Sequence, residues 1–173
     1  MNNAFERYVD PSFVYKFMQG PDKVLDEHTA RTQGVNCISL AHLAMRDLFG
    51  YSLPTSLHCY EMFSDTSHFK TVESIDFLEP GDLMWFGLRH PGIPIDQYQP
   101  QYDERGTLVN WRDNPVKHVA IYTGEQANDD YLMLHATNIE GTNAVWPLQK
   151  FASFKRYERV YRISRLAVGE TGS

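Results

Sequence analysis

One cysteine of this chain lies where a thiol could act as a nucleophile. Cys37 opens an apolar segment, and Asn36 before it is a residue type that caps helices. In the first turn of a helix, unpaired backbone N–H groups and the positive end of the helix dipole favour an anion. A thiol there ionises more easily, and thiolate is the nucleophilic form. Since cysteines are also common as small buried core residues, the position alone leaves both interpretations open.

Two histidines could act with this thiol. They lie in consecutive strand-like runs, "HVAIYTG" and "YLMLHAT", whose short polar connection favours a β-hairpin. If Thr123 pairs with Asp130, the same register places His118 directly opposite His135, on one face of the sheet. Such a pair can serve as a base with its orienting partner, as two metal ligands, or as ordinary sheet residues. The other five histidines show no comparable arrangement.

A helix must hold the cysteine. Apolar side chains recur with helical spacing at positions 37, 40, 41, 44 and 48, and Gly50 is a natural stop. The pattern predicts a helix that starts at Cys37 with Asn36 as its N-cap.

The segments on either side of that helix have weaker patterns. Residues 3–19 resemble a helix interrupted near Pro11, and the turn residues at 20–22 would end it. Segment 51–80 reads as a loop with a short helix around "LHCYEMF".

The second half of the chain is rich in strand-forming residues. Its runs of β-branched and aromatic residues predict strands at 83–87, 118–124, 131–137, 143–148 and 159–165. A helical half followed by an antiparallel half indicates the α+β class.

A long segment, 88–117, separates the first two of these strands. It is dense in proline, glycine, tyrosine and polar residues, and a loop of that length in a small domain is usually functional or disordered. Tyr98, Tyr102 and Trp111 offer apolar faces with polar tips that could grip a peptide or sugar. We expect a lid or cleft wall, with packing of the loop onto the domain as the alternative.

Size and composition indicate one domain. The 173 residues, 42% hydrophobic and 13% aromatic, suffice for an ordinary buried core. We expect a single domain over residues 1–168 and a flexible tail at 169–173. The net charge of −6 and the scattered basic residues argue against nucleic acid or an anionic membrane as the main partner.

The compartment is predicted from what the chain lacks. The N-terminus has no basic start followed by an apolar run, and no window approaches the roughly 18 apolar residues that would span a bilayer. We expect a protein that is cytoplasmic as synthesised, unless a route without a signal peptide exports it. A reducing compartment would keep both cysteines, Cys37 and Cys59, as thiols. The pattern does not indicate an oligomeric state.

Four features in this order resemble the NlpC-type cysteine peptidases, which are papain-like cell-wall endopeptidases and amidases. They are Cys37 at a helix start, then "LEPGDLMWF", "HVAIYTG" and "LHAT". The resemblance implies a papain-like domain whose helical half packs on a small antiparallel sheet. It implies Cys37 as nucleophile, His118 as general base and His135 as its orienter, with no cofactor and no metal. The expected substrate is a peptidoglycan-type peptide, cleaved through a thioester, with the Cys37 N–H as an oxyanion donor.

The chain departs from the family beside the nucleophile. Members usually have an acidic residue and a serine flanking the cysteine, where this chain has Asn36 and Ile38. In some relatives those groups hold the free amine of a short murein peptide, so a different specificity is expected here. Asn36 and the three aromatic residues of segment 88–117 are the candidates for substrate binding.

Other functions remain open on these residues. One is a papain-like acyltransferase that passes the thioester to another acceptor. Another is a non-catalytic binding module, or a zinc site built from Cys37, His118 and His135. Cys59 is given no role, so its replacement by alanine is expected to be nearly silent.

Overall fold

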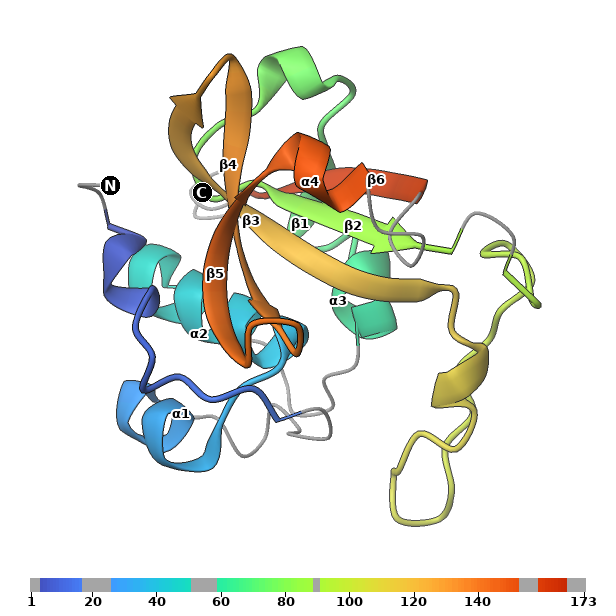
Figure 1. Ribbon diagram of the computed structural model, residues 1–173. Coiled ribbons are helices and arrows are strands. Elements are labelled where there is room, and N and C mark those ends of the chain that lie inside the picture. The colour runs from blue at the N-terminus through green and yellow to red at the C-terminus, as the bar shows by residue number, and fades with distance from the viewer. Residues whose placement is uncertain (1–3, 17–25, 51–58, 89–90, 153–158, 168–173) are drawn as a thin grey trace.

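The computed structural model of this chain describes residues 4–16, 26–50, 59–88, 91–152 and 159–167. Over these residues α-helices accompany one antiparallel sheet with the strand order β1-β6-β2-β3-β4-β5, so the class is α+β (Figure 1). The helices are α1 Glu27–Gln33, α2 Cys37–Phe49, α3 Cys59–Ser64 and α4 Leu148–Ala152. The strands are β1 Phe69–Thr71, β2 Leu83–Gly87, β3 Val116–Ala127, β4 Asp130–Thr137, β5 Thr142–Pro147 and β6 Arg159–Leu166.

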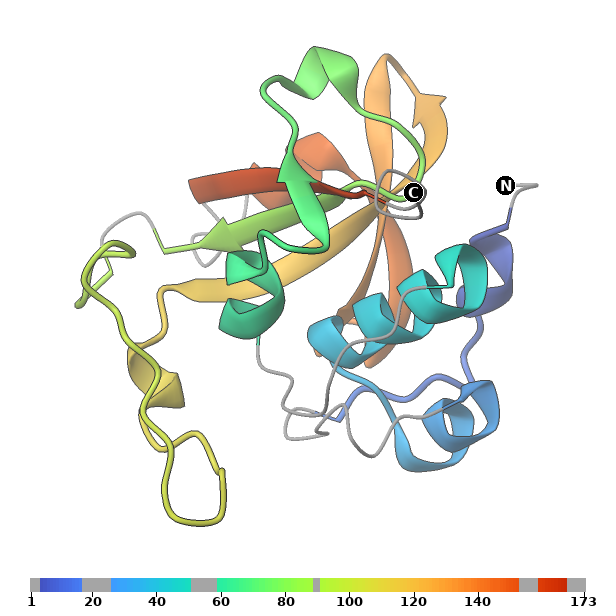
Figure 2. The same ribbon diagram turned by 180° about the vertical axis from the view of Figure 1, so that it is seen from behind.

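The sheet separates two hydrophobic clusters, because successive side chains of a strand point to opposite faces. In β2, Leu83 and Trp85 join the larger cluster with the buried face of α2, whereas Met84 and Phe86 join a smaller cluster with Phe151 of α4. The two ribbon views show the sheet from its two sides, with α4 in front in Figure 1 and with α2 and α3 in front in Figure 2.

Most of the predicted elements are present. The helix that starts at Cys37 ends at Phe49, and Gly50 follows in the left-handed conformation with φ 70°. The strand predicted at 83–87 is β2, and the other four predicted strands overlap β3, β4, β5 and β6. The helix α3 overlaps the predicted short helix around "LHCYEMF".

The prediction for the N-terminal segment was wrong within the described residues. A 3-10 helix at Glu6–Tyr8 is followed by extended chain, in which Val14 bridges Thr142 and Tyr15 bridges Val35. Pro11 interrupts the segment, and the pieces on either side are too short to be stable helices alone. Residues 17–22 of that prediction, like part of the predicted 51–80 loop and the tail at 169–173, lie outside the described residues.

The predicted register of the β3–β4 hairpin was also wrong, by two residues. Ile121 pairs with Leu134, and this register, continued by one residue, sets Ala120 rather than His118 opposite His135. The strands continue beyond the predicted turn, with a bulge, and meet at a two-residue turn in which Asn128 and Asp129 have φ 52° and 60°. Positive φ at both central residues is typical of a type I′ hairpin, and asparagine and aspartate tolerate it.

The segment between β2 and β3 is an excursion from the sheet. It projects to one side of the molecule in both ribbon views (Figures 1 and 2). Its described part contains a 3-10 helix at Trp111–Asp113 and an isolated bridge between Tyr102 and Leu108. Among the described residues, no helix combines the length and the hydrophobicity needed to cross a membrane.

Candidate active site

Cys37 is the first residue of α2, and local hydrogen bonds determine where this helix begins. The Asn36 side chain accepts from the Ser39 N–H at 2.9 Å, and the Ser39 hydroxyl accepts from the Asn36 N–H at 2.8 Å. This capping box satisfies two backbone donors at the helix start. Val35 is held by its bridge to Tyr15 just before the cap. Asn36, a candidate for substrate binding, therefore caps the helix with its side-chain oxygen.

The Cys37 thiol has a second thiol beside it. The Sγ atoms of Cys37 and Cys59 lie 3.8 Å apart, and both residues are partly buried and unbridged. The hydrogen bond with Cys59 is the largest cause that lowers the pKa of Cys37 well below its ordinary value, while burial opposes it. The same contact raises the pKa of Cys59. This contact therefore favours the thiolate form at Cys37 and the thiol form at Cys59.

His118 is a second side-chain partner of the Cys37 sulfur. Its charge and a side-chain hydrogen bond also lower the pKa of Cys37, and the Val119 backbone N–H adds to them. An imidazolium beside a thiolate stabilises it, as in other activated cysteines.

His118 is joined in turn to His135. The His118 Nε2 and His135 Nδ1 atoms are 2.7 Å apart, and the two rings are nearly perpendicular at 87°. Because Nε2 of His118 is engaged with His135, Nδ1 is the nitrogen left to face Cys37. The structure therefore brings together the three residues Cys37, His118 and His135 in one hydrogen-bonded series.

Burial favours the neutral form of His135. Its side chain is 1% exposed and lies against the rings of Trp146 and Phe151, with centroids at 4.2 and 4.7 Å. Desolvation, aided by the charges of His118 and Lys150, lowers the pKa of His135 to about 2. A neutral His135 that accepts from the Nε2–H of His118 at Nδ1 must carry its own proton on Nε2. In this arrangement Nε2 of His118 keeps its proton, so Nδ1 is the nitrogen that exchanges a proton with sulfur.

The geometry gives no support to the zinc alternative. The two facing nitrogens of His118 and His135 are directed at each other at hydrogen-bonding distance, so they cannot both bind one ion. Across the part of the chain that the structure describes, no three His, Cys, Asp or Glu side chains are grouped to hold a metal.

The three aromatic candidates of segment 88–117 differ in their positions. Tyr98 is 2% exposed and packs edge-on against Tyr60 of α3, with centroids 4.9 Å apart, so its ring anchors the loop. Tyr102 is 43% exposed and its hydroxyl donates to the Glu61 carboxylate of α3. Trp111 is partly buried beneath the Arg112 guanidinium. Segment 88–117 is thus attached to the helix that carries Cys59.

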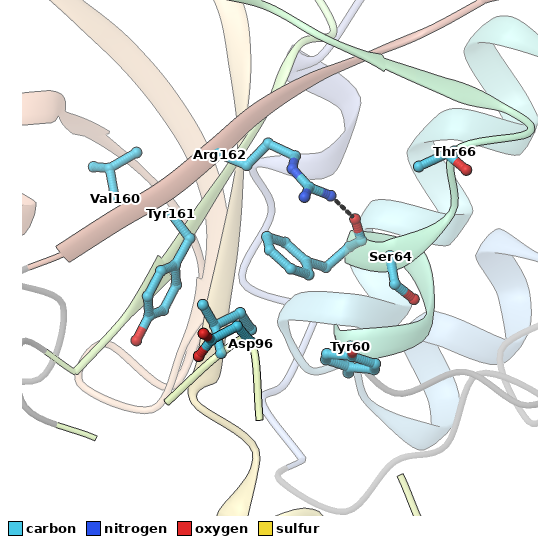
Figure 3. Close-up of a pocket in the computed structure, with 9 residues that line it drawn as sticks. Tyr60, Ser64, Thr66, Asp96, Val160, Tyr161 and Arg162 are labelled. Atoms are coloured by element: carbon cyan, nitrogen blue, oxygen red, sulfur yellow. Dashed lines mark hydrogen bonds between the residues drawn. The ribbon is translucent and has the colours of Figure 1, made fainter. Parts of the chain in front are cut away.

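A groove lies beside that helix. It has a volume of about 420 Å³ and lies between α3, the start of segment 88–117 and β6 (Figure 3). Arg162 of β6 donates to the Phe63 carbonyl across one wall. Nine residues line it: Tyr60, Phe63, Ser64, Thr66, Ile95, Asp96, Val160, Tyr161 and Arg162.

Cys59 is the site residue that the sequence analysis missed. It opens α3, and no spacing rule relates it to a residue 22 positions earlier in another helix. The sequence offered one signal for Cys59, which is that the chain has two cysteines and Cys59 is one of them.

The arrangement as a whole can generate a thiolate, protonate a leaving group and hold the base in one tautomer. Comparisons of the chain with protein-family models, with curated proteins and with solved structures find no match.

Proposed function

We propose that the protein is a cysteine-dependent amide hydrolase, an endopeptidase or amidase of the papain-like NlpC type that acts on peptidoglycan-type peptides. One observation carries the proposal. Cys37, at a helix start, has a depressed pKa and contacts His118, whose other nitrogen is 2.7 Å from a neutral His135. This order of nucleophile, base and orienter is the one that thiol hydrolases require.

Acylation would begin from the thiolate. The Cys37 sulfur attacks the amide carbonyl carbon, and the carbonyl oxygen becomes an oxyanion. Backbone N–H groups at the start of α2 suit that charge, because they point along the helix dipole. His118 then gives its Nδ1 proton to the amide nitrogen, so the C–N bond breaks, the amine leaves and a thioester remains.

Deacylation would use the same base. Neutral His118 removes a proton from water, whose oxygen attacks the thioester carbonyl, and the C–S bond breaks to release a carboxylic acid and the thiolate. Throughout, a hydrogen bond from Nε2–H of His118 to Nδ1 of His135, which lie 2.7 Å apart, would keep Nδ1 of His118 directed at the reacting atoms. Since its partner is a neutral ring rather than a carboxylate, we expect orientation to be its main contribution.

The substrate class follows from the family resemblance. The helix start, the "LEPGDLMWF" turn and strand, and the two histidine-bearing strands occur in the order typical of NlpC-type peptidases. The α2 helix packs against one face of an antiparallel sheet, which is compatible with a papain-like fold. A family member would act on short peptides of peptidoglycan, with Tyr102 and Trp111 as the remaining aromatic candidates for contacts.

Mass spectrometry of purified muropeptides after incubation with the protein tests the proposal. Cleavage of one amide bond with addition of one water, absent with Cys37→Ala, is the expected result. A product joined to a second amine instead would identify the acyltransferase alternative. Intact muropeptides, with a Cys37 that reacts with iodoacetamide, would remove the proposed substrate class.

A further inference from the structure

We propose that Cys37 and Cys59 form a reversible disulfide, so that the candidate site is also a site of oxidation by hydroperoxides. The proposal concerns the two thiols alone and does not depend on amide hydrolysis.

The geometry places the two sulfurs close to bonding distance. Their Sγ atoms are 3.8 Å apart, so they must approach by about 2 Å to reach the length of an S–S bond. Each cysteine is the first residue of its helix, Cys37 in α2 and Cys59 in α3. Side-chain rotation at two helix ends can supply much of this approach without repacking the apolar residues of either helix.

The two thiols are also electronically unequal. Cys37 is the thiol of the pair that ionises more easily, because Cys59 and His118 both lower its pKa. Cys59 keeps its proton, since the adjacent thiolate raises its pKa. A thiolate with a thiol beside it corresponds to an attacking cysteine and a resolving cysteine.

The chemistry balances in two steps with a hydroperoxide as oxidant. The Cys37 thiolate attacks the terminal peroxide oxygen, the S–O bond forms, the O–O bond breaks, and the leaving alkoxide or hydroxide takes a proton. Cys59, losing its own proton, attacks the Cys37 sulfenic sulfur, the S–S bond forms and water leaves. Together two thiols and one hydroperoxide give a disulfide, an alcohol or water, and one further water. A dithiol reductant reverses the oxidation by exchange.

The disulfide has two consequences for the site. It removes the thiolate that faces His118, so a nucleophile is unavailable while the bond lasts. It also intercepts the sulfenic acid before a second peroxide converts it to sulfinic acid, which thiols do not reduce.

Peptide mapping of the full chain tests the proposal without any substrate. The wild-type protein, Cys59→Ser and Cys37→Ser are treated with hydrogen peroxide at low protein concentration, alkylated and digested. In the wild type we expect a cross-linked peptide joining residues 37 and 59, with a loss of two hydrogens that dithiothreitol restores. In Cys59→Ser, which keeps a group of similar size, Cys37 should proceed to sulfinic acid that dithiothreitol does not recover. In Cys37→Ser, Cys59 should stay alkylatable.

Two results would overturn the proposal. One is accumulation of Cys37 sulfinic acid in the wild type at the rate seen in Cys59→Ser. The other is a disulfide that forms only between two molecules. Circular dichroism of each variant before oxidation establishes that it is folded. The peroxide experiment does not measure muropeptide cleavage, so a negative result would not bear on the proposed hydrolase activity.

Discussion

His118 Nε2 lies 2.7 Å from His135 Nδ1, although the register of the Ile121–Leu134 pair, continued by one residue, sets Ala120 opposite His135. The hydrogen bond therefore spans a diagonal between two strands. Because side chains alternate with a period of two, the two-residue difference from the predicted register leaves both rings on one face. The contact depends on the reach of both imidazole rings.

Replacing the nucleophile or the base should abolish muropeptide cleavage. We expect Cys37→Ala and His118→Gln each to reduce kcat/KM by at least about 10³-fold, since each removes a group that forms or transfers a bond. His118 is 3% exposed beside Phe86 and Phe151, so glutamine, which leaves less of a cavity than alanine, is the better test. Thermal unfolding checks the fold. A His118→Gln variant with a tenth of wild-type activity would exclude it as the base.

His135 should be replaceable in part. In His135→Gln the amide oxygen of the new side chain can accept from the Nε2–H of His118, and glutamine is long enough to span the diagonal better than asparagine. We therefore expect His135→Gln to retain more activity than His135→Asn, and His135→Leu to retain least. Steady-state kinetics on the three variants give the order. Equal loss in all three would mean that the hydrogen bond to His118 does not orient the base.

Cys59 should control the ionisation of Cys37. The hydrogen bond from Cys59 is the largest cause of the low pKa of Cys37, so we expect Cys59→Ala to raise that pKa. Cys59→Ser keeps a donor and should raise it less. The rate of iodoacetamide alkylation against pH, assigned by peptide mapping, reports the pKa. From the sequence, Cys59→Ala was expected to leave activity nearly unchanged, because Cys59 had no role in the site. In the structure the Cys59 Sγ lies 3.8 Å from the Cys37 Sγ, so this expectation no longer has a basis. An unchanged profile in Cys59→Ala would contradict the prediction.

Two buried histidines should make the fold sensitive to mild acid. Burial lowers the pKa of His135 to about 2 and that of His42 to about 3, whereas an unfolded histidine titrates near about 6.5. Below about pH 6.5 the unfolded chain binds a proton at each position and the folded chain does not. Their contribution to stability is complete above that pH and is lost as the pH falls toward the folded pKa values.

The expected loss is roughly 1.4 kcal/mol per pH unit for each histidine, at pH values well below 6.5. Urea unfolding at pH 6.5, 5.5 and 4.5 measures it. The free energy of unfolding of His135→Gln should fall less steeply with decreasing pH than that of the wild type, because one of the two buried histidines is gone. A slope that is the same in both proteins would show that His135 is protonated in the folded state.

Variants at two tyrosines of segment 88–117 should distinguish a role in anchoring the loop from a role in contacting substrate. Tyr98 is 2% exposed, so Tyr98→Ala should lower the free energy of unfolding by about 3 kcal/mol. Tyr102 is 43% exposed, so Tyr102→Ala should change it by less than about 1 kcal/mol. If this segment is a cleft wall, Tyr102→Ala should instead alter the relative cleavage rates of different muropeptides. Unchanged relative rates would leave packing as the role of the loop.

The sequence by itself determined the elements whose signals are local. The start of α2 follows from Asn36 and Ser39 within one turn of Cys37, and its end follows from Gly50. The alternation of strand residues was sufficient to place both histidines on one face, because that result depends only on the parity of the register. These features need no knowledge of distant residues.

The tertiary structure decided what depends on long-range packing. The contact of Cys59 with Cys37 arises because α3 and α2 pack beside the same sheet, and no spacing within either helix specifies it. The hairpin register was set by a bulge and a turn at Asn128 and Asp129 rather than by the apolar pattern. Burial of His135 among aromatic rings, which keeps it neutral, likewise requires β5 and α4 to be in place, because desolvation comes from surrounding atoms rather than from chain neighbours.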